Sequence, residues 1–241
     1  MTTEIVNIKL NDTNVEVIQK NIKHIHLRVY PPNGRVKVSA PESMAMDTIR
    51  VFVISKLDWI KKQQIKLRAQ AREAPREYVD RESHYFNGKR YLLEVIEHNS
   101  PAKVRLNSQT IELFVRPRTP IDKRRSLLNE WYRQQLKRVV PQIIEKYEKI
   151  MDVSVCEFGI KLMKTKWGTC NPKAKRIWLN LELAKKPSEC LEYIVVHEMV
   201  HLLEHSHNSR FVSYMDKFMP KWRFYKEELN RLSVRYEDWR Y

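Results

Sequence analysis

The chain has 241 residues, of which 42% are hydrophobic and 10% aromatic, and this composition is typical of a folded globular protein and excludes a disordered one. A formal net charge of +16, spread along the chain rather than gathered in one tail, makes nucleic acid or an acidic protein a candidate partner. With only four glycines and neither a G-x-G-x-x-G nor a Walker pattern, the sequence predicts no nucleotide cofactor.

The chain starts with MTTEIVNIKLND, which has neither the basic nor the apolar region of a signal peptide. No apolar run approaches the roughly 20 residues needed to cross a bilayer. The three cysteines, Cys156, Cys170 and Cys190, are odd in number and lack C-x-x-C spacing, which favours reduced thiols over a disulfide framework. We therefore expect a cytoplasmic protein without a membrane partner.

The first half of the chain has strand patterns on both sides of a helical one. Apolar and polar residues alternate on both sides of Pro-Pro-Asn-Gly in residues 22–40, which predicts a β-hairpin. From residue 41 to about 73, apolar residues recur near the helical period and predict a helix. Residues 84–116 alternate again, with turns at Asn87-Gly88 and Asn107-Ser108.

The second half is mainly helical. An amphipathic pattern predicts a helix over about 121–150, and Pro141 predicts a kink or a break within it. The remaining segments predict strands over 153–163 and 176–182, a helix over 188–204 capped by Ser188, and one or two further helices over 208–231. These patterns predict an α+β fold with an N-terminal region of hairpins and one helix (1–118) and a second region (119–241). We find no internal repeat.

Residues 195–211, VVHEMVHLLEHSHNSRF, contain four of the eight histidines. His197 and His201 lie four residues apart, so both imidazoles share one helix face and can reach one ion at about 2.0–2.1 Å. Glu198 lies beside them, where a carboxylate can take a proton from metal-bound water. Apolar neighbours on nearly every side indicate a buried helix, in which these polar groups would be costly without a metal. The pattern therefore predicts a metal site.

Spacing alone leaves several candidates for the third ligand. In a continuous helix, His205 would lie about 12 Å along the axis from His197, so it can bind only if the helix ends directly after His201. His207 leaves room for a turn over residues 204–206, and we favour it. His205 and a later glutamate, either Glu227 or Glu228, are the alternatives. Three protein ligands and one open position are typical of catalytic zinc.

Four motifs in a fixed order carry a resemblance to a known family. They are Lys166-Trp167-Gly168-Thr169-Cys170, then Ile177-Trp178-Leu179-Asn180, then the H-E-x-x-H at 197–201, and then His207-Asn208-Ser209-Arg210-Phe211. With these motifs the chain resembles the YgjP-like metallopeptidase domain, which is related to the SprT-like zinc metallopeptidases. The stretch Arg35–Pro41, the pair Trp59-Ile60 and the pair Trp131-Tyr132 also fit. One departure is Asn208, where Ser or Gly is usual.

The resemblance implies a zincin-like α+β metallopeptidase domain, whose H-E-x-x-H helix packs on a small mixed sheet. It further implies one Zn²⁺ per chain bound by His197, His201 and His207. Glu198 would act as general base in the hydrolysis of a peptide or protein substrate. In this mechanism zinc lowers the pKa of its water toward 7, Glu198 accepts the proton, and the hydroxide attacks a carbonyl group polarised by the same ion.

Residues 177–180 are a plausible sheet edge to which an extended peptide could add, and they make Trp178 and Asn180 candidate substrate-binding residues. Trp167 and Cys170 are expected to pack in the core. The oxyanion donor stays open among four residues after the third ligand: Tyr214, Lys217, Trp222 and Arg223.

Two other functions compete with a peptidase. One is a DNA-associated regulatory or binding protein whose zinc site is structural or vestigial. Glu198 argues against it, because a structural site needs no base. The other is a zinc amidase that acts on a non-peptide bond.

Overall fold

The computed structural model describes residues 5–30, 34–69, 76–163 and 166–231. The chain divides into two compact units, with the boundary between Ala74 and Pro75. Within the described residues, no helix is both long enough and apolar enough to cross a membrane.

The first unit contains a four-stranded sheet with the order β1-β2-β4-β3. Its strands are β1 (Ile5–Leu10), β2 (Thr13–Lys20), β3 (His26–Tyr30) and β4 (Arg35–Pro41). The predicted hairpin over 22–40 is confirmed, since β3 and β4 are antiparallel with Val29 opposite Val36. The β2–β4 pair at the centre of the sheet is parallel. Residues 31–33, in the predicted turn, lie outside the described residues.

Two helices follow where one was predicted, namely α1 (Met46–Ser55) and α2 (Leu57–Ala69). Lys56, with φ −109° and ψ 3°, caps α1 and separates the two helices. Residues 70–73 of the predicted helix lie outside the described residues. The helices and the sheet share a closed apolar core made of Ile8, Val15, Val17, Val36, Val38, Ala40, Ile49, Val53 and Ile60.

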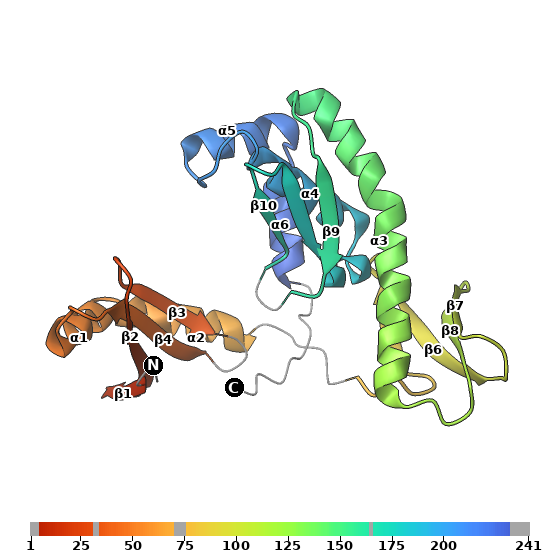
Figure 1. Cartoon of the computed structure of the whole chain (residues 1–241), viewed down its shortest axis with the longest axis horizontal. Helices are drawn as coiled ribbons and strands as arrows, with labels where there is room; N and C mark the ends of the chain where they lie inside the picture. The colour runs from red at the N-terminus through yellow and green to blue at the C-terminus, as the bar shows by residue number, and fades with distance from the viewer. Residues whose placement is uncertain (1–4, 31–33, 70–75, 164–165, 232–241) are drawn as a thin grey trace. The chain divides into compact units, whose positions relative to one another are not determined.

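A second four-stranded sheet begins the second unit (Figure 1). It contains β5 (Ser83–Phe86), β6 (Lys89–Glu97), β7 (Lys103–Leu106) and β8 (Thr110–Val115), in the order β5-β6-β8-β7. The predicted strands over 84–116 and the Asn87-Gly88 turn are confirmed, with both turn residues at positive φ. This sheet repeats the strand order and directions of the first one, so the chain contains a repeat of topology that its sequence does not show.

Helix α3 (Ile121–Met151) continues through Pro141, so of the predicted kink or break the break is wrong. The side chain of Pro141 is exposed. One face of α3 is buried along its whole length and contacts β7 and β8 of the second sheet as well as β9 and α4 further along the chain. The hydroxyl of Tyr132 on this helix donates a hydrogen bond of 2.8 Å to the Tyr85 carbonyl in β5. This packing places the β5–β8 sheet in one unit with the following residues, whereas we expected a boundary at residue 118.

The last part of the chain is a three-stranded mixed sheet covered by helices. Its strands β9 (Glu157–Lys161), β10 (Gly168–Asn171) and β11 (Arg176–Asn180) have the order β10-β11-β9, with β11 antiparallel to β10 and parallel to β9. A 3₁₀ turn, η1 (Leu181–Lys185), leads to α4 (Ser188–Val200), α5 (Ser209–Phe218) and α6 (Trp222–Arg231).

Helix α4 packs on β10 and β11 and contacts α5 and α6. The expected α+β class, with this helix on a small mixed sheet, is therefore confirmed. The helix is shorter than predicted, because it ends at Val200 rather than at residue 204. Pro187, and not Ser188, occupies the N-cap position, so the predicted Ser188 cap is wrong. Strand β10, only four residues long, was not predicted.

Candidate metal centre and its cleft

The core helix α4 carries the H-E-x-x-H sequence at its C-terminal end. Nine of its 13 residues are buried, in agreement with the apolar pattern around His197. Immediately after Val200 the chain turns, with backbone hydrogen bonds from Leu203 and Glu204 to the Val200 carbonyl of 2.9 and 3.0 Å. His201 is the C-cap residue of this helix. Because α4 ends here, the residues that follow can fold back and bring His207 close to His197 and His201.

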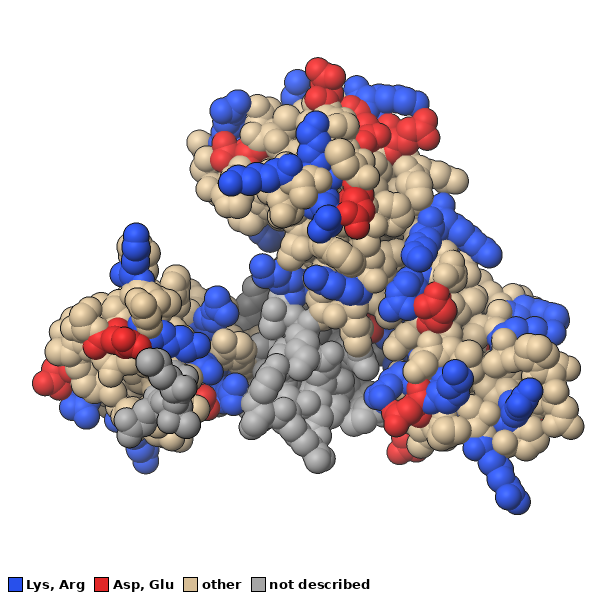
Figure 2. All heavy atoms as spheres, viewed as in Figure 1, with Lys and Arg blue, Asp and Glu red and all other residues tan. Residues whose placement is uncertain are grey.

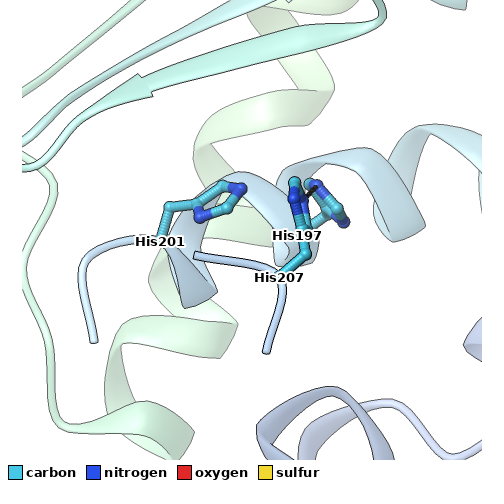
Figure 3. A group of neighbouring side chains, drawn as sticks. All are labelled: His197, His201 and His207. Carbon is cyan, nitrogen blue, oxygen red and sulfur yellow. Dashed lines mark hydrogen bonds between the residues drawn. The ribbon is translucent and has the colours of Figure 1, made fainter. Parts of the chain in front are cut away.

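His197, His201 and His207 come together in space (Figure 3). One potential ligand atom from each lies within 4.8 Å of the others. The Nε2 atoms of His197 and His207 are 3.0 Å apart. Two nitrogens bound at about 2.0–2.1 Å to one tetrahedral ion would be roughly 3.4 Å apart, so this spacing suits a shared ion. His205 lines the cleft but does not belong to this group of three.

Neighbouring groups fix how the three imidazoles point. Nδ1 of His201 lies 3.0 Å from the Glu204 carbonyl oxygen, and a proton on Nδ1 would leave Nε2 free as a ligand. The Phe211 ring lies 4.6 to 5.0 Å from all three imidazole rings, measured between centroids. Asn208 caps α5 by accepting a hydrogen bond of 3.0 Å from the Phe211 N–H. Asn208 therefore helps to position both Phe211 and the adjacent His207.

The surroundings keep two of the imidazoles neutral, which is the form that binds a metal. Burial lowers the pKa of His197 to about 3, with further lowering by His201, His207 and Lys226. Burial also lowers the pKa of His201. Three converging imidazoles are a donor set that suits zinc and several other first-row divalent metals. The residues present thus fit a metal ion.

Glu198 is 5% exposed and lies against strand β10. Burial raises the pKa of its carboxyl group to about 8, and the charge of Lys166 opposes this increase. A Cβ added to Gly168 would come within 2.6 Å of Glu198 Oε1 and 2.7 Å of its Cγ. Only glycine at position 168 therefore leaves the Glu198 carboxylate in its place.

A cleft of about 480 Å³ contains these groups. That volume is within the range of about 300–1,000 Å³ usual for ligand sites. It is lined by Lys166, Trp167, Gly168, Thr169, Cys170, Tyr193, Ile194, His197, Glu198, His201, His205, His207, Lys226, Leu229 and Asn230. One wall is therefore the segment 166–170 with strand β10, and another is helix α6.

The prediction that residues 177–180 form a sheet edge is wrong, because β11 lies between β10 and β9. Trp178 lies over Gly159 and is 4.6 Å from Lys161 Nζ, measured to the ring centroid. Asn180 is 5% exposed, and its side chain donates to the carbonyls of Met163 and Lys166. The structure brings neither Trp178 nor Asn180 into the lining of the cleft.

The four residues considered as oxyanion donors are not in the cleft lining either. Trp222 donates a hydrogen bond of 2.8 Å to Asp216, which also pairs with Arg223. Tyr214 accepts hydrogen bonds from Arg210.

The two glutamates considered as alternative ligands do not join the histidines. Glu228 lies with its Oε2 3.9 Å from the Cys190 sulfur, and Glu227 is not in the lining.

Tyr193 and Lys226 are among the lining residues that sequence reasoning missed. Tyr193 lies one helical turn before His197, so the four-residue spacing that paired His197 with His201 could have found it. Burial raises the pKa of its hydroxyl to about 12, and its ring lies 5.9 Å from that of His197. Lys226 comes from α6, and no local pattern connects it with α4.

A family model described as YgjP-like, metallopeptidase domain, matches residues 23–232 of this chain. The chain belongs to the YgjP-like metallopeptidase family. The resemblance carried by the four motifs is thereby confirmed. The family description implies a metal ion and a peptide or protein substrate.

Two solved structures are similar to parts of the chain. The metallopeptidase zymogen abylysin of Pyrococcus abyssi is 22% identical, and the match covers 40% of this chain and 100% of that one with a TM-score of 0.36. For the metallopeptidase zymogen jannalysin of Methanocaldococcus jannaschii, identity is 22%, coverage is 37% and 92%, and the TM-score is 0.33. No curated protein matches the chain.

Proposed function

We propose that this protein is a zinc-dependent peptidase in which His197, His201 and His207 bind the metal and Glu198 is the general base. The observation that carries the proposal is the convergence of three imidazoles beside a buried carboxylate in one cleft. A divalent ion bound there would supply Lewis-acid chemistry, which activates water and polarises a carbonyl group.

Glu198 performs the proton transfers. Its carboxylate accepts a proton from the attacking water and passes it to the leaving amine. Burial raises the pKa of this carboxyl group, so its carboxylate is a stronger base than that of an exposed glutamate. Gly168 fixes the position of the carboxylate, since any larger side chain would occupy the same space.

The substrate backbone binds along β10. This strand pairs with β11 on one side and has no strand on its other side among the described residues. Residues Gly168, Thr169 and Cys170 of β10 also line the cleft. An extended peptide can therefore add to this edge by backbone hydrogen bonds, with its scissile bond beside Glu198. This role falls to β10 instead of the strand containing Trp178 and Asn180.

Replacing Glu198 by glutamine tests the base. The variant should keep one zinc per chain, measured by atomic absorption, and lose at least about 100-fold in the cleavage rate of casein or a peptide library. Glu227→Gln is the matched control, because Glu227 is exposed and outside the cleft lining, and it should retain both properties. Undiminished cleavage by the Glu198 variant would refute the general-base role.

Two histidine variants test the ligand set. His207→Ala should lose zinc, whereas His205→Ala should keep it, because only His207 lies within ligand distance of the other two histidines. Zinc loss in the His205 variant alone would reassign the third ligand.

Gly168→Ala tests the positioning of Glu198. We expect kcat to fall by about 100-fold, with zinc content and KM little changed, because the added methyl group displaces the carboxylate. Asn171→Ala on the same strand is the control for a general effect on β10, because Asn171 is exposed and outside the cleft lining. Equal kcat values for Gly168→Ala and the wild type would show that Glu198 tolerates the methyl group.

A further inference from the structure

The cleft contains two lysines that come from different walls. Lys166 lies just before β10, and Lys226 lies on α6. Neither forms an ion pair with any described residue, although Lys226 Nζ lies 5.4 Å from the centroid of the Trp222 ring. Glu198 is the only carboxylate among the lining residues. All other lining residues have positively charged or neutral side chains.

Both ammonium groups belong to the lining of the cleft that also contains Glu198 and His197. Both lysines are therefore close enough to reach a peptide bound beside these residues. Their side chains are exposed, so they can move toward a ligand.

Three acidic residues that follow the H-E-x-x-H in the chain have contacts outside the cleft lining. Asp216 is paired with Arg223 and accepts a hydrogen bond from Trp222. The carboxylate of Glu228 faces the Cys190 sulfur, and one oxygen of Glu204 accepts a hydrogen bond of 3.1 Å from the Ser206 backbone. None of the three lines the cleft, so none of them neutralises Lys166 or Lys226.

We propose that the cleft selects acidic peptides, with Lys166 and Lys226 binding carboxylate side chains of the substrate. This inference rests on the proposed peptidase function and names its substrate class. The net charge of +16 acts in the same direction, because a positive protein attracts acidic substrates and a cleft with apolar walls concentrates the field. Two positive walls without an internal acid also disfavour basic peptides.

An acidic peptide fits these observations better than nucleic acid does. The cleft has a free strand edge suited to an extended peptide backbone. On the face shown in Figure 2, lysine and arginine side chains are scattered and interspersed with acidic ones, and no continuous basic stripe of the kind that follows a phosphate backbone is visible.

The test measures binding, so that it does not depend on turnover. The full-length, zinc-loaded Glu198→Gln variant is titrated with two fluorescein-labelled nonapeptides, one with glutamate at alternate positions and one with glutamine there. At low salt the glutamate peptide should bind roughly tenfold or more tightly. This preference should shrink as salt increases, because the interaction is electrostatic.

Variants of the two lysines test whether the preference for the glutamate peptide arises in the cleft. Lys166→Met and Lys226→Met, each in the Glu198→Gln background, should reduce the preference about threefold to tenfold. Lys173→Met and Lys221→Met are the controls, since they remove the same charge from exposed positions outside the cleft lining. The double Lys166→Glu, Lys226→Glu variant should instead prefer a lysine-containing peptide. The zinc charge is common to all variants and cannot produce these differences.

Three results would overturn the proposal. They are equal affinity for the two peptides, no detectable binding of either one, and a preference unchanged in the lysine variants. If duplex DNA at an equal concentration of charge displaced the glutamate peptide, the cleft would instead be a binding site for nucleic acid. Failure of the peptidase function would be seen separately, as an unchanged cleavage rate on replacing Glu198 in the otherwise wild-type protein.

Discussion

The sheets β1–β4 and β5–β8 have the same topology but different helical partners. In each, a first antiparallel hairpin precedes a parallel pair at the centre, and the third strand returns to the edge. The first sheet packs with α1 and α2 into a core of its own. The second shares its core with α3, α4 and the mixed sheet.

This difference shows how one arrangement of strands can serve two purposes. The first sheet and its helices have an apolar core of their own, to which no residue of the metal centre belongs. The second sheet supports the metal centre, because α3 contacts both β8 and α4. The backbone N–H groups of Asn87 and Gly88 in its first turn also donate to the carbonyls of Ala184 and Lys185 in η1, just before α4.

The largest expected contrast comes from removing matched core side chains. Ile60 in α2 and Ile111 in β8 are both fully buried. Replacement by alanine should cost about 2–5 kcal/mol in either place. Only Ile111→Ala should lower the urea concentration at which the metal centre unfolds. Urea titrations of the cobalt-substituted protein, followed by the visible absorbance of the ion, measure this concentration.

The same titrations followed by far-ultraviolet circular dichroism provide the control. In Ile60→Ala they should show an earlier partial transition that leaves the cobalt signal unchanged. If Ile60→Ala shifts the cobalt transition as far as Ile111→Ala does, the first unit is not independent of the site.

A second contrast is the response to acid. His84 in β5 is 1% exposed, with Nε2 2.8 Å from Glu82 Oε2 and Nδ1 without a hydrogen-bond partner among the described residues. Burial, followed by the charge of Arg76, lowers its pKa from 6.5 to about 4. In the described part of the first unit, the only buried polar residue is Thr13, which does not ionise.

As pH falls below 6.5, the unfolded chain protonates at His84 before the folded one does. The stability that the neutral imidazole contributes is therefore complete above pH 6.5 and is lost as pH falls toward 4, by about 3 kcal/mol in all. His84→Gln should remove this part of the pH dependence while keeping a donor for Glu82. Chemical denaturation of both metal-free proteins at pH 7.5 and 4.5 measures the difference, and parallel losses in the two proteins would disprove the role of His84.

The sequence predicts most local elements of the second unit but fewer of the first, where β1 and β2 were not predicted and α1 and α2 were taken as one helix, and it does not predict how the strands connect. Strong alternation identified β3 to β8, and helical periodicity identified α3, α4, α5 and α6. It could not reveal that β2 pairs with β4, because a parallel pair joins residues distant in the sequence. Strand β10 was missed for another reason, since its four residues are too few to show alternation.

The residues of the candidate site also fall into those that the local sequence predicts and those that only the tertiary fold brings together. His197, Glu198 and His201 lie within five residues, so helix geometry alone brings them together. The choice of His207 over His205 depends on how the chain turns after Val200, which spacing leaves open. Gly168 and Lys226 reach the cleft from other elements, and their proximity to Glu198 and His197 is a tertiary property.

A third contrast comes from two glycines, each in a turn of one sheet. Gly34 and Gly88 both have φ of 75°, so alanine should cost about 1–2 kcal/mol in backbone strain at either position. A Cβ on Gly34 would meet the side chain of Gln64, at 2.7 Å from its Cγ. A Cβ on Gly88 would meet Pro187, including its backbone nitrogen and Cα at 3.2 Å.

Because backbone cannot move aside as a side chain can, Gly88→Ala should cost about 1–3 kcal/mol more than Gly34→Ala. Denaturation of each unit measures both values, and a double-mutant cycle identifies the cause. Gln64→Ala should relieve most of the contact energy in the Gly34→Ala protein. Pro187→Ala should relieve only part of it in the Gly88→Ala protein, because the backbone contacts remain. Full relief by Pro187→Ala would mean that the turn of the second sheet touches the start of α4 through the proline ring alone.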